Sequence, residues 1–273
     1  MASPPSPVRI VGPRDGAPAL YLHGAPGAPV EAELIAGAAH EQRVALHAVS
    51  RADIPFGGGP ADYIDRLTEV VARLDGGRRL PIIGFSIGAA LALRVAARLK
   101  GDAGPLRLLA AAGPLDVPGA FEGMGAGKRV FRSAQAGGAG FAMTVAAQAL
   151  LARRAPGLLR RMLFAGAAPS DRALATSADG QARLARVFAA AWADGGHAYR
   201  RDLTAYVEPW AAELDAVTAP VELWHGTDDN WAPIAMARGI ARRLPAARLH
   251  EAEGGHYTTL IAQAPQALAV VAG

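Results

Sequence analysis

The N-terminal half of the chain alternates short apolar runs with helical segments. The apolar runs predict strands and lie at 19–23, 44–49, 80–85 and 106–112. The stretches between them predict helices, most clearly at 62–74, where apolar residues recur at helical spacing. This alternation is typical of βαβ units, which build a mostly parallel sheet covered by helices. We therefore expect an α/β fold with a doubly wound sheet.

The pattern changes in the middle of the chain. From 115 to 217 there is no strand signal, only glycine-rich linkers and helical segments, of which the best are 141–154, 157–164, 181–193 and 198–207. Strand signals resume at 221–225 and 247–251, with a helix around 233–244 between them and a last helix from Tyr257. We therefore expect a core formed by 1–114 and 218–273, with a helical cap, 115–217, inserted into it.

One five-residue motif contains a candidate catalytic serine. Gly84-Phe85-Ser86-Ile87-Gly88 fits G-x-S-x-G, directly follows the 80–85 strand and opens a helix over 87–99. A nucleophile elbow needs this placement, because the sharp reversal exposes the serine hydroxyl and the glycines let neighbouring backbones approach. The alternative is a chance Gly-Ser-Gly turn, which the flanking strand and helix disfavour. Ser86 is therefore the candidate nucleophile.

A serine nucleophile needs a base, and the base needs an acid to orient it. His256 follows the last predicted strand in a glycine turn, Glu253-Gly254-Gly255-His256, so we expect it on a loop at the sheet edge. Asp228 and Asp229 follow the 221–225 strand, and Asp116 follows the 106–112 strand. His256 is thus the candidate base, and the acid is one of these three aspartates.

These pieces together resemble the α/β-hydrolase superfamily, and more narrowly its small capped members grouped with proline iminopeptidases, esterases and epoxide hydrolases. The matching segments are His23-Gly24-Ala25-Pro26-Gly27, the Ser86 elbow, the block from Trp224 to Pro233, and Gly255-His256. The family's acid motif, G-x-x-D-x-x-x-P, falls on Gly226 and Pro233 and implies that Asp229 is the acid. The resemblance also implies an oxyanion hole formed by the backbone N–H groups of Ala25 and Ile87, with His23 in a structural role.

The sequence departs from these relatives at two places, the loop after the second predicted strand and the elbow. Relatives carry a D-x-x-G-x-G-x-S-like loop after the second strand, whereas here the loop begins Arg51-Ala52-Asp53-Ile54. Iminopeptidases tend to carry a tryptophan after the serine, where this chain has Ile87. Epoxide hydrolases and haloalkane dehalogenases have an aspartate at the elbow, so Ser86 argues against both.

Composition bounds the remaining possibilities. The chain has no cysteine, and its net charge is +4, with arginine pairs dispersed among apolar residues rather than clustered with aromatic ones. We therefore expect no nucleic-acid partner. The segment from Gly123 to Arg129 lacks the serine or threonine of a phosphate loop and is expected to be a flexible linker. No metal-ligand spacing occurs, so neither a metal nor another cofactor is expected.

The longest apolar stretch, 81–93, is shorter than the roughly 20 residues that span a bilayer. No secretory signal is visible in the first residues. We expect a cytoplasmic protein without a membrane partner; its oligomeric state stays open.

The sequence therefore predicts a serine hydrolase that cleaves a small or medium carboxylic ester through an acyl-enzyme on Ser86. An amide, a thioester or a C–C bond beside a ketone is the alternative substrate, because the same triad serves all of them. A non-catalytic protein that binds a ligand in the same pocket is a further alternative.

Overall fold

The computed structural model describes residues 8–55, 57–125, 127–244, 246–269 and 271. Its centre is a seven-stranded sheet in the order β1-β3-β2-β4-β5-β6-β7. The strands are β1 (Val8–Val11), β2 (Ala17–Leu22), β3 (Val44–Val49), β4 (Ile82–Phe85), β5 (Leu106–Leu109), β6 (Val221–Gly226) and β7 (Arg248–Ala252). β1 pairs antiparallel with β3, and every other pairing is parallel. The predicted doubly wound, mostly parallel sheet is confirmed.

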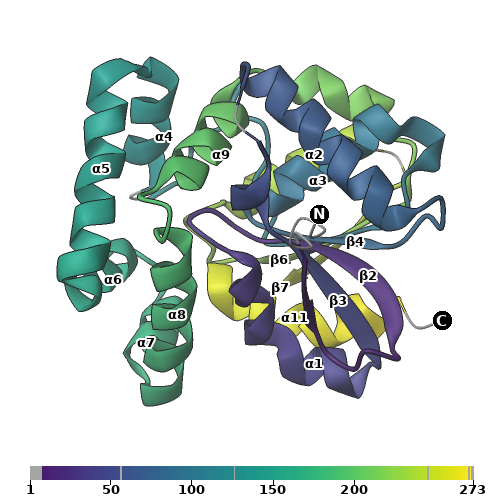
Figure 1. Cartoon of the computed structure of the whole chain (residues 1–273), viewed down its shortest axis with the longest axis horizontal. Coiled ribbons are helices and arrows are strands. Elements are labelled where there is room, and N and C mark those ends of the chain that lie inside the picture. The colour runs from purple at the N-terminus through teal and green to yellow at the C-terminus, as the bar shows by residue number, and fades with distance from the viewer. Residues whose placement is uncertain (1–7, 56, 126, 245, 270, 272–273) are drawn as a thin grey trace, which may run out of the picture.

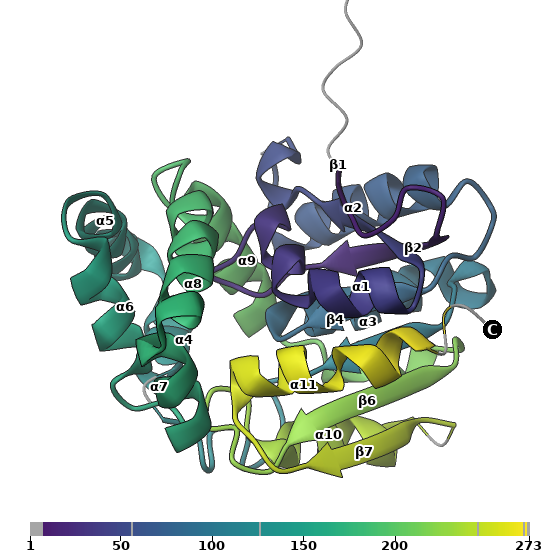
Figure 2. The same cartoon turned by 90° about the horizontal axis from the view of Figure 1, so that it is seen from below.

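Helices cover both faces of the sheet (Figures 1 and 2). On one face lie α2 (Pro60–Asp75), α3 (Ile87–Leu99) and α10 (Ile234–Arg243); on the other lie α1 (Ala36–Glu41) and α11 (His256–Ala269). Short 3₁₀ turns complete the loops: η1 (Pro29–Ile35), η2 (Arg51–Asp53), η3 (Lys100–Asp102) and η4 (Ala211–Ala216). β4, β5 and most of α3 are buried, which explains why their sequences are continuously apolar rather than striped.

All six predicted strands are present, and β1 is the strand that the sequence analysis missed. It pairs with β3 from Val8 opposite Val49 to Val11 opposite Leu46. Only Val11 of its four residues is buried, so the strand has no apolar alternation that would reveal it. α2 was found because its apolar residues recur at helical spacing. The structure shows that its ends are marked as well: Pro60 stands in its first turn, and Gly76 ends it with a left-handed φ of 59°.

Between β5 and β6 the regular elements are helices and the η4 turn (Figure 1). The helices are α4 (Gly127–Ala136), α5 (Gly138–Arg154), α6 (Pro156–Phe164), α7 (Pro169–Thr176), α8 (Ala178–Ala191) and α9 (His197–Val207). We call α4–α9 the helical insertion. The flexible linker expected at 123–129 is wrong in its second half, because α4 begins at Gly127; α7 was also not predicted. The cap boundaries, at 114/115 and 217/218, stay predictions.

Candidate active site

Ser86 occupies the turn between β4 and α3 in a conformation that few non-glycine residues adopt. Its φ is 56° and its ψ is −124°. The turn is held from both sides, since the Ser86 amide donates to the carbonyl of Leu109 at 3.1 Å and the Ser86 carbonyl accepts from Ala112 N at 3.1 Å. Strained backbone persists where the surroundings over-determine it, and such positions cluster at functional sites. The predicted strand–turn–helix placement of Ser86 is present.

The two glycines of the motif are needed for close backbone approach. A Cβ on Gly84 would lie 2.7 Å from Cα of Ala89, and a Cβ on Gly88 would lie 2.1 Å from the carbonyl oxygen of Leu22. Real Cβ atoms essentially never come this close, so any side chain would push α3 away from β4 or from β2. The glycines therefore set how tightly the elbow packs on the sheet.

His256 and Asp229 are hydrogen-bonded to each other. Nδ1 of His256 donates to Oδ2 of Asp229 at 2.6 Å, and both side chains are buried. Because a carboxylate only accepts, this bond places the imidazole proton on Nδ1 and leaves Nε2 as a free acceptor. Oδ1 of Asp229 accepts from the amides of Trp231 at 2.9 Å and Ala232 at 3.0 Å, which fixes the carboxylate.

The electrostatics of this pair keep Asp229 ionised and make the His256 imidazole a stronger base. Burial alone would raise the pKa of Asp229, but the charges and hydrogen bonds of His256 and His225 outweigh burial and hold that pKa well below its ordinary value. Burial alone would lower the pKa of His256, and the Asp229 carboxylate reverses this and raises it. Asp229 is thus a permanent anion that stabilises a proton on the imidazole.

Packing holds the imidazole beside the elbow. Its ring lies 4.8 Å from the ring of Phe85, the residue before Ser86, and 5.5 Å from that of Trp231. The expected loop position is wrong by one residue, because His256 is the first residue of α11. Its amide donates to Asp171 Oδ2 at 2.6 Å, and the same carboxylate accepts from the amide of Thr258 at 2.9 Å. A carboxylate of the helical insertion thus caps the helix that carries His256.

The rival acids lie elsewhere. Asp228 is exposed. Asp116 accepts from the amides of Trp210 at 3.3 Å and Ala211 at 3.1 Å, and so holds the start of η4. Of the three candidates, Asp229 is the one bonded to His256.

The loop after β2 borders the same site. Ala25 lines a cavity together with Ser86. Neither the Ala25 nor the Ile87 amide donates to another group in the described part of the chain, so neither has a protein acceptor there. His23 is buried, donates through Nδ1 to the carbonyl of Gly24 at 2.8 Å, and has its pKa lowered to about 3 by burial and Arg51. It is neutral and bonded within the loop.

Two buried ionisable side chains that the sequence analysis did not assign hold this loop. Glu31 Oε1 accepts from the Gly24 amide at 2.8 Å. Arg51 donates to the carbonyls of His23 at 2.6 Å and Gly24 at 2.9 Å, and pairs with Asp202 of α9 at 2.6 Å. Arg51 stands where the sequence departs from the family's loop pattern, which was the one signal available.

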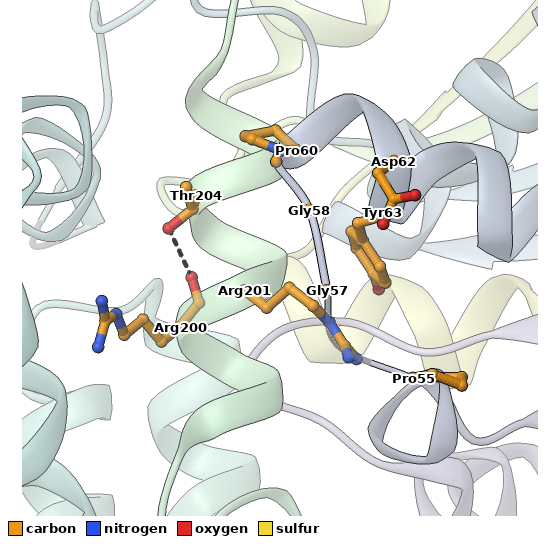
Figure 3. A pocket seen from close by; sticks show the side chains of 10 residues that line it. Pro55, Gly57, Gly58, Pro60, Asp62, Tyr63, Arg200, Arg201 and Thr204 are labelled. Carbon is orange, nitrogen blue, oxygen red and sulfur yellow. Dashed lines mark hydrogen bonds between the residues drawn. The ribbon is translucent and has the colours of Figure 1, made fainter.

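A second, smaller cavity of about 130 Å³ lies where α9 meets the loop before α2 (Figure 3). Arg201 crosses from α9 to this loop, with its guanidinium 4.3 Å from the ring centre of Tyr63 and a donated bond to the carbonyl of Ile54 at 2.9 Å. The Tyr63 hydroxyl donates to Asp202 at 2.5 Å. These contacts anchor the helical insertion to the core beside the candidate site.

The cavity above Ser86 measures about 490 Å³, within the range of about 300–1,000 Å³ common for ligand sites. Helices α4, α5, α6 and α9 of the insertion supply most of its wall. The lining is chiefly apolar and includes Val130, Phe131, Leu151, Leu159, Met162 and Leu163. Besides Ser86, its polar side chains are Thr144, Gln148 and Tyr199.

Within the described ranges, no group of three or more His, Asp or Glu side chains could hold a metal ion. No described helix has both the length and the apolar character needed to cross a membrane.

Solved structures share this fold at low sequence identity. A hydrolase from Pseudomonas aeruginosa PA01 is 14% identical, with 97% of this chain and 92% of that chain covered and a TM-score of 0.69. A bromoperoxidase from Bacillus anthracis is 15% identical, with 97% and 94% covered and a TM-score of 0.67. A structure described among carboxylesterases of Nitrososphaera gargenis is 17% identical, with 95% and 92% covered and a TM-score of 0.62.

No match was found among curated proteins. The model of the alpha/beta hydrolase family matches residues 19–271, which include the elbow, the acid block and His256. The chain therefore belongs to the alpha/beta hydrolase family.

Proposed function

We propose that the protein is a serine hydrolase that cleaves a small or medium carboxylic ester through an acyl-enzyme on Ser86. The observation that carries the proposal is the bond between His256 Nδ1 and Asp229 beside a strained serine elbow. This arrangement fixes the tautomer in which Nε2 can take the serine proton.

The reaction follows from these positions. Ser86 Oγ attacks the ester carbonyl carbon while His256 Nε2 takes its proton, and the carbonyl oxygen becomes an oxyanion bound by the amides of Ala25 and Ile87. The imidazolium then gives its proton to the departing alkoxide, which leaves as the alcohol. In the second half, His256 deprotonates a water molecule that attacks the acyl-enzyme, and the acid and free Ser86 are released.

The cavity supports an ester with apolar substituents. Its wall offers few polar anchors, and burying each methylene of a substrate there contributes about 0.8 kcal/mol. Gln148 Oε1 is buried without a partner among the described residues, so it provides one position for a donor on the substrate. An amide, a thioester or a C–C bond is the alternative, since the serine chemistry does not select the leaving group.

Two measurements test the proposal. A fluorophosphonate probe should label the wild type and the control Ser133→Ala, in which a serine of α4 is removed, but not Ser86→Ala. A chromogenic panel of esters, amides and thioesters of varied acyl length should show the fastest turnover on short or medium esters. An unlabelled wild type would instead support a non-catalytic ligand-binding protein, and faster turnover of an amide or thioester would move the assignment to that bond.

A further inference from the structure

Large apolar side chains are exposed together on the part of the helical insertion farthest from the sheet. Six such side chains are exposed in the described part of the chain, and four of them lie on α5 and α6. They are Met143 (71% exposed), Leu150 (56%), Leu158 (42%) and Met162 (57%). Helices α5 and α6 pack against each other at the outer end of the molecule (Figures 1 and 2). Single exposed apolar residues are ordinary, whereas a cluster marks an interaction surface.

These two helices and the preceding α4 are strongly basic. Between Gly123 and Ser170 the sequence holds seven Lys and Arg residues and no Asp or Glu. Because the whole chain carries +4, the rest of it carries −3. None of these seven cations forms an ion pair within the described residues, whereas arginines elsewhere commonly do, as Arg238 does with Glu251. The positive charge of the molecule is thus concentrated, unneutralised, on α4–α6.

Helical spacing places the two kinds of side chain together. In α5, Leu150 lies seven residues after Met143, and Arg154 lies four residues after Leu150. This spacing places all three along one side of the helix, and all three are exposed. In α6, Leu158, Arg161 and Met162 share a side in the same way. We call the surface formed by Met143, Leu150, Arg153, Arg154, Leu158, Arg161 and Met162 the basic apolar face.

This face adjoins the cavity above Ser86. Ala147, which lies between Met143 and Leu150 on α5, is exposed and also lines the cavity. Met162 of α6 does the same. A molecule held at the basic apolar face therefore lies at the edge of the candidate substrate site.

We propose that the basic apolar face docks on the surface of an anionic lipid membrane. Surface-bound helices combine Leu, Met or aromatic side chains, which enter the headgroup boundary, with Lys and Arg, which attract anionic lipid. A second copy of the chain fits poorly, because two surfaces of the same strong charge repel each other. A nucleic acid fits poorly as well, since the large apolar side chains exposed in the described ranges include no aromatic one for stacking.

The proposal replaces the sequence-based expectation of no membrane partner. That expectation rested on apolar stretches too short to span a bilayer, whereas docking on a membrane surface needs no such stretch. The pairs Arg153-Arg154 and Arg160-Arg161, which look dispersed along the sequence, lie on adjacent helices in the fold. Docking concerns the surface and not the reaction, so it holds or fails independently of the proposed esterase activity.

Cosedimentation with vesicles tests the proposal without any turnover. The wild type should bind phosphatidylcholine vesicles that contain phosphatidylglycerol, and should bind pure phosphatidylcholine vesicles much more weakly. Arg153→Gln/Arg154→Gln should weaken binding to the anionic vesicles roughly 30-fold, since each basic residue near the surface contributes about a fivefold preference. The charge-matched control Arg14→Gln/Arg73→Gln removes two exposed arginines outside the insertion and should bind as the wild type does.

A second variant tests the apolar part of the face. Met143→Ser/Leu150→Ser should also weaken vesicle binding, and its melting temperature should match that of the wild type because both side chains are exposed. Equal binding to both kinds of vesicle, no binding to either, or equal loss in the Arg14/Arg73 control would overturn the proposal. Binding to polyglutamate without binding to vesicles would overturn it too, and would point to an acidic protein instead.

Discussion

Glu31 is a buried acid whose replacement by glutamine should change how stability depends on pH. The side chain is fully buried; Oε1 accepts from the Tyr21 hydroxyl at 2.9 Å and the Gly24 amide at 2.8 Å, while Oε2 has no partner among the described residues. Burial raises the pKa of Glu31 from 4.5 to about 7, against the opposing effects of these two hydrogen bonds and of Arg51. The folded protein therefore keeps a proton that the unfolded chain releases.

The size and sign of the effect follow from this shift. Well below pH 4.5 the carboxyl is protonated in both states, and well above about pH 7 it is ionised in both, so its contribution is constant in each range. Between these values the unfolded state binds fewer protons, and stability falls as pH rises. With about 1.4 kcal/mol per pKa unit, the carboxyl makes the free energy of unfolding about 3 kcal/mol smaller at pH 8 than at pH 4.5.

Urea unfolding of the wild type and Glu31→Gln across this pH range measures the effect. Glutamine keeps the acceptor for Tyr21 and Gly24 but does not titrate, so the stability of the variant relative to the wild type should increase by about 3 kcal/mol between pH 4.5 and pH 8. Other titrating groups are common to both proteins and cancel in the difference. Glu41→Gln, at an exposed position, is the control and should differ from the wild type by less than about 0.5 kcal/mol throughout. A difference between Glu31→Gln and the wild type that does not change with pH would refute the reasoning.

Three further predictions concern the candidate site. Asp229→Asn should lower kcat on a chromogenic ester by about 10⁴, because the imidazole loses its orienting acceptor, whereas Asp228→Asn should change it less than about twofold; similar losses in both would refute the assignment. Asp229 raises the pKa of His256, and the base must be neutral, so kcat/KM should fall as the pH drops through a midpoint above 6.5. In the residual activity of Asp229→Asn that midpoint should lie at lower pH, and a pH profile of each protein checks this. Gly88→Ala should lower stability in thermal unfolding by about 3 kcal/mol, since its Cβ would overlap the Leu22 carbonyl, and an unchanged Tm would show that α3 can move away.

The parts of the site that could be predicted from the sequence are those whose position follows from a short motif or from the end of a neighbouring strand. The elbow is a five-residue turn between a strand and a helix, and its two glycines are required by contacts that any such turn makes. Asp229 and His256 follow β6 and β7, whose carboxyl ends meet the elbow at one edge of the sheet. Parallel strands therefore converted positions far apart in the sequence into neighbours.

What the sequence did not reveal depends on contacts that have no local pattern. α4 is flanked on both sides by glycine-rich segments that discourage helix formation, yet it forms and packs on α9, with the ring of Phe131 5.1 Å from that of Tyr206. Tertiary packing of this kind outweighs propensity in most protein helices. Asp171 caps α11 from 85 residues away along the chain, so no spacing rule could have assigned it.

The buried ion pair of Arg51 and Asp202 is a long-range contact of the same kind beside the candidate site. Its members are separated by 151 residues, and both are buried. Buried ion pairs add little net stability, but removing one partner leaves an uncompensated charge and costs about 3–5 kcal/mol. The same guanidinium holds the carbonyls of His23 and Gly24, so the carboxylate that α9 supplies helps to position the loop proposed to bind the oxyanion. The helical insertion therefore contributes to the geometry of the candidate site as well as to the wall of the cavity above it.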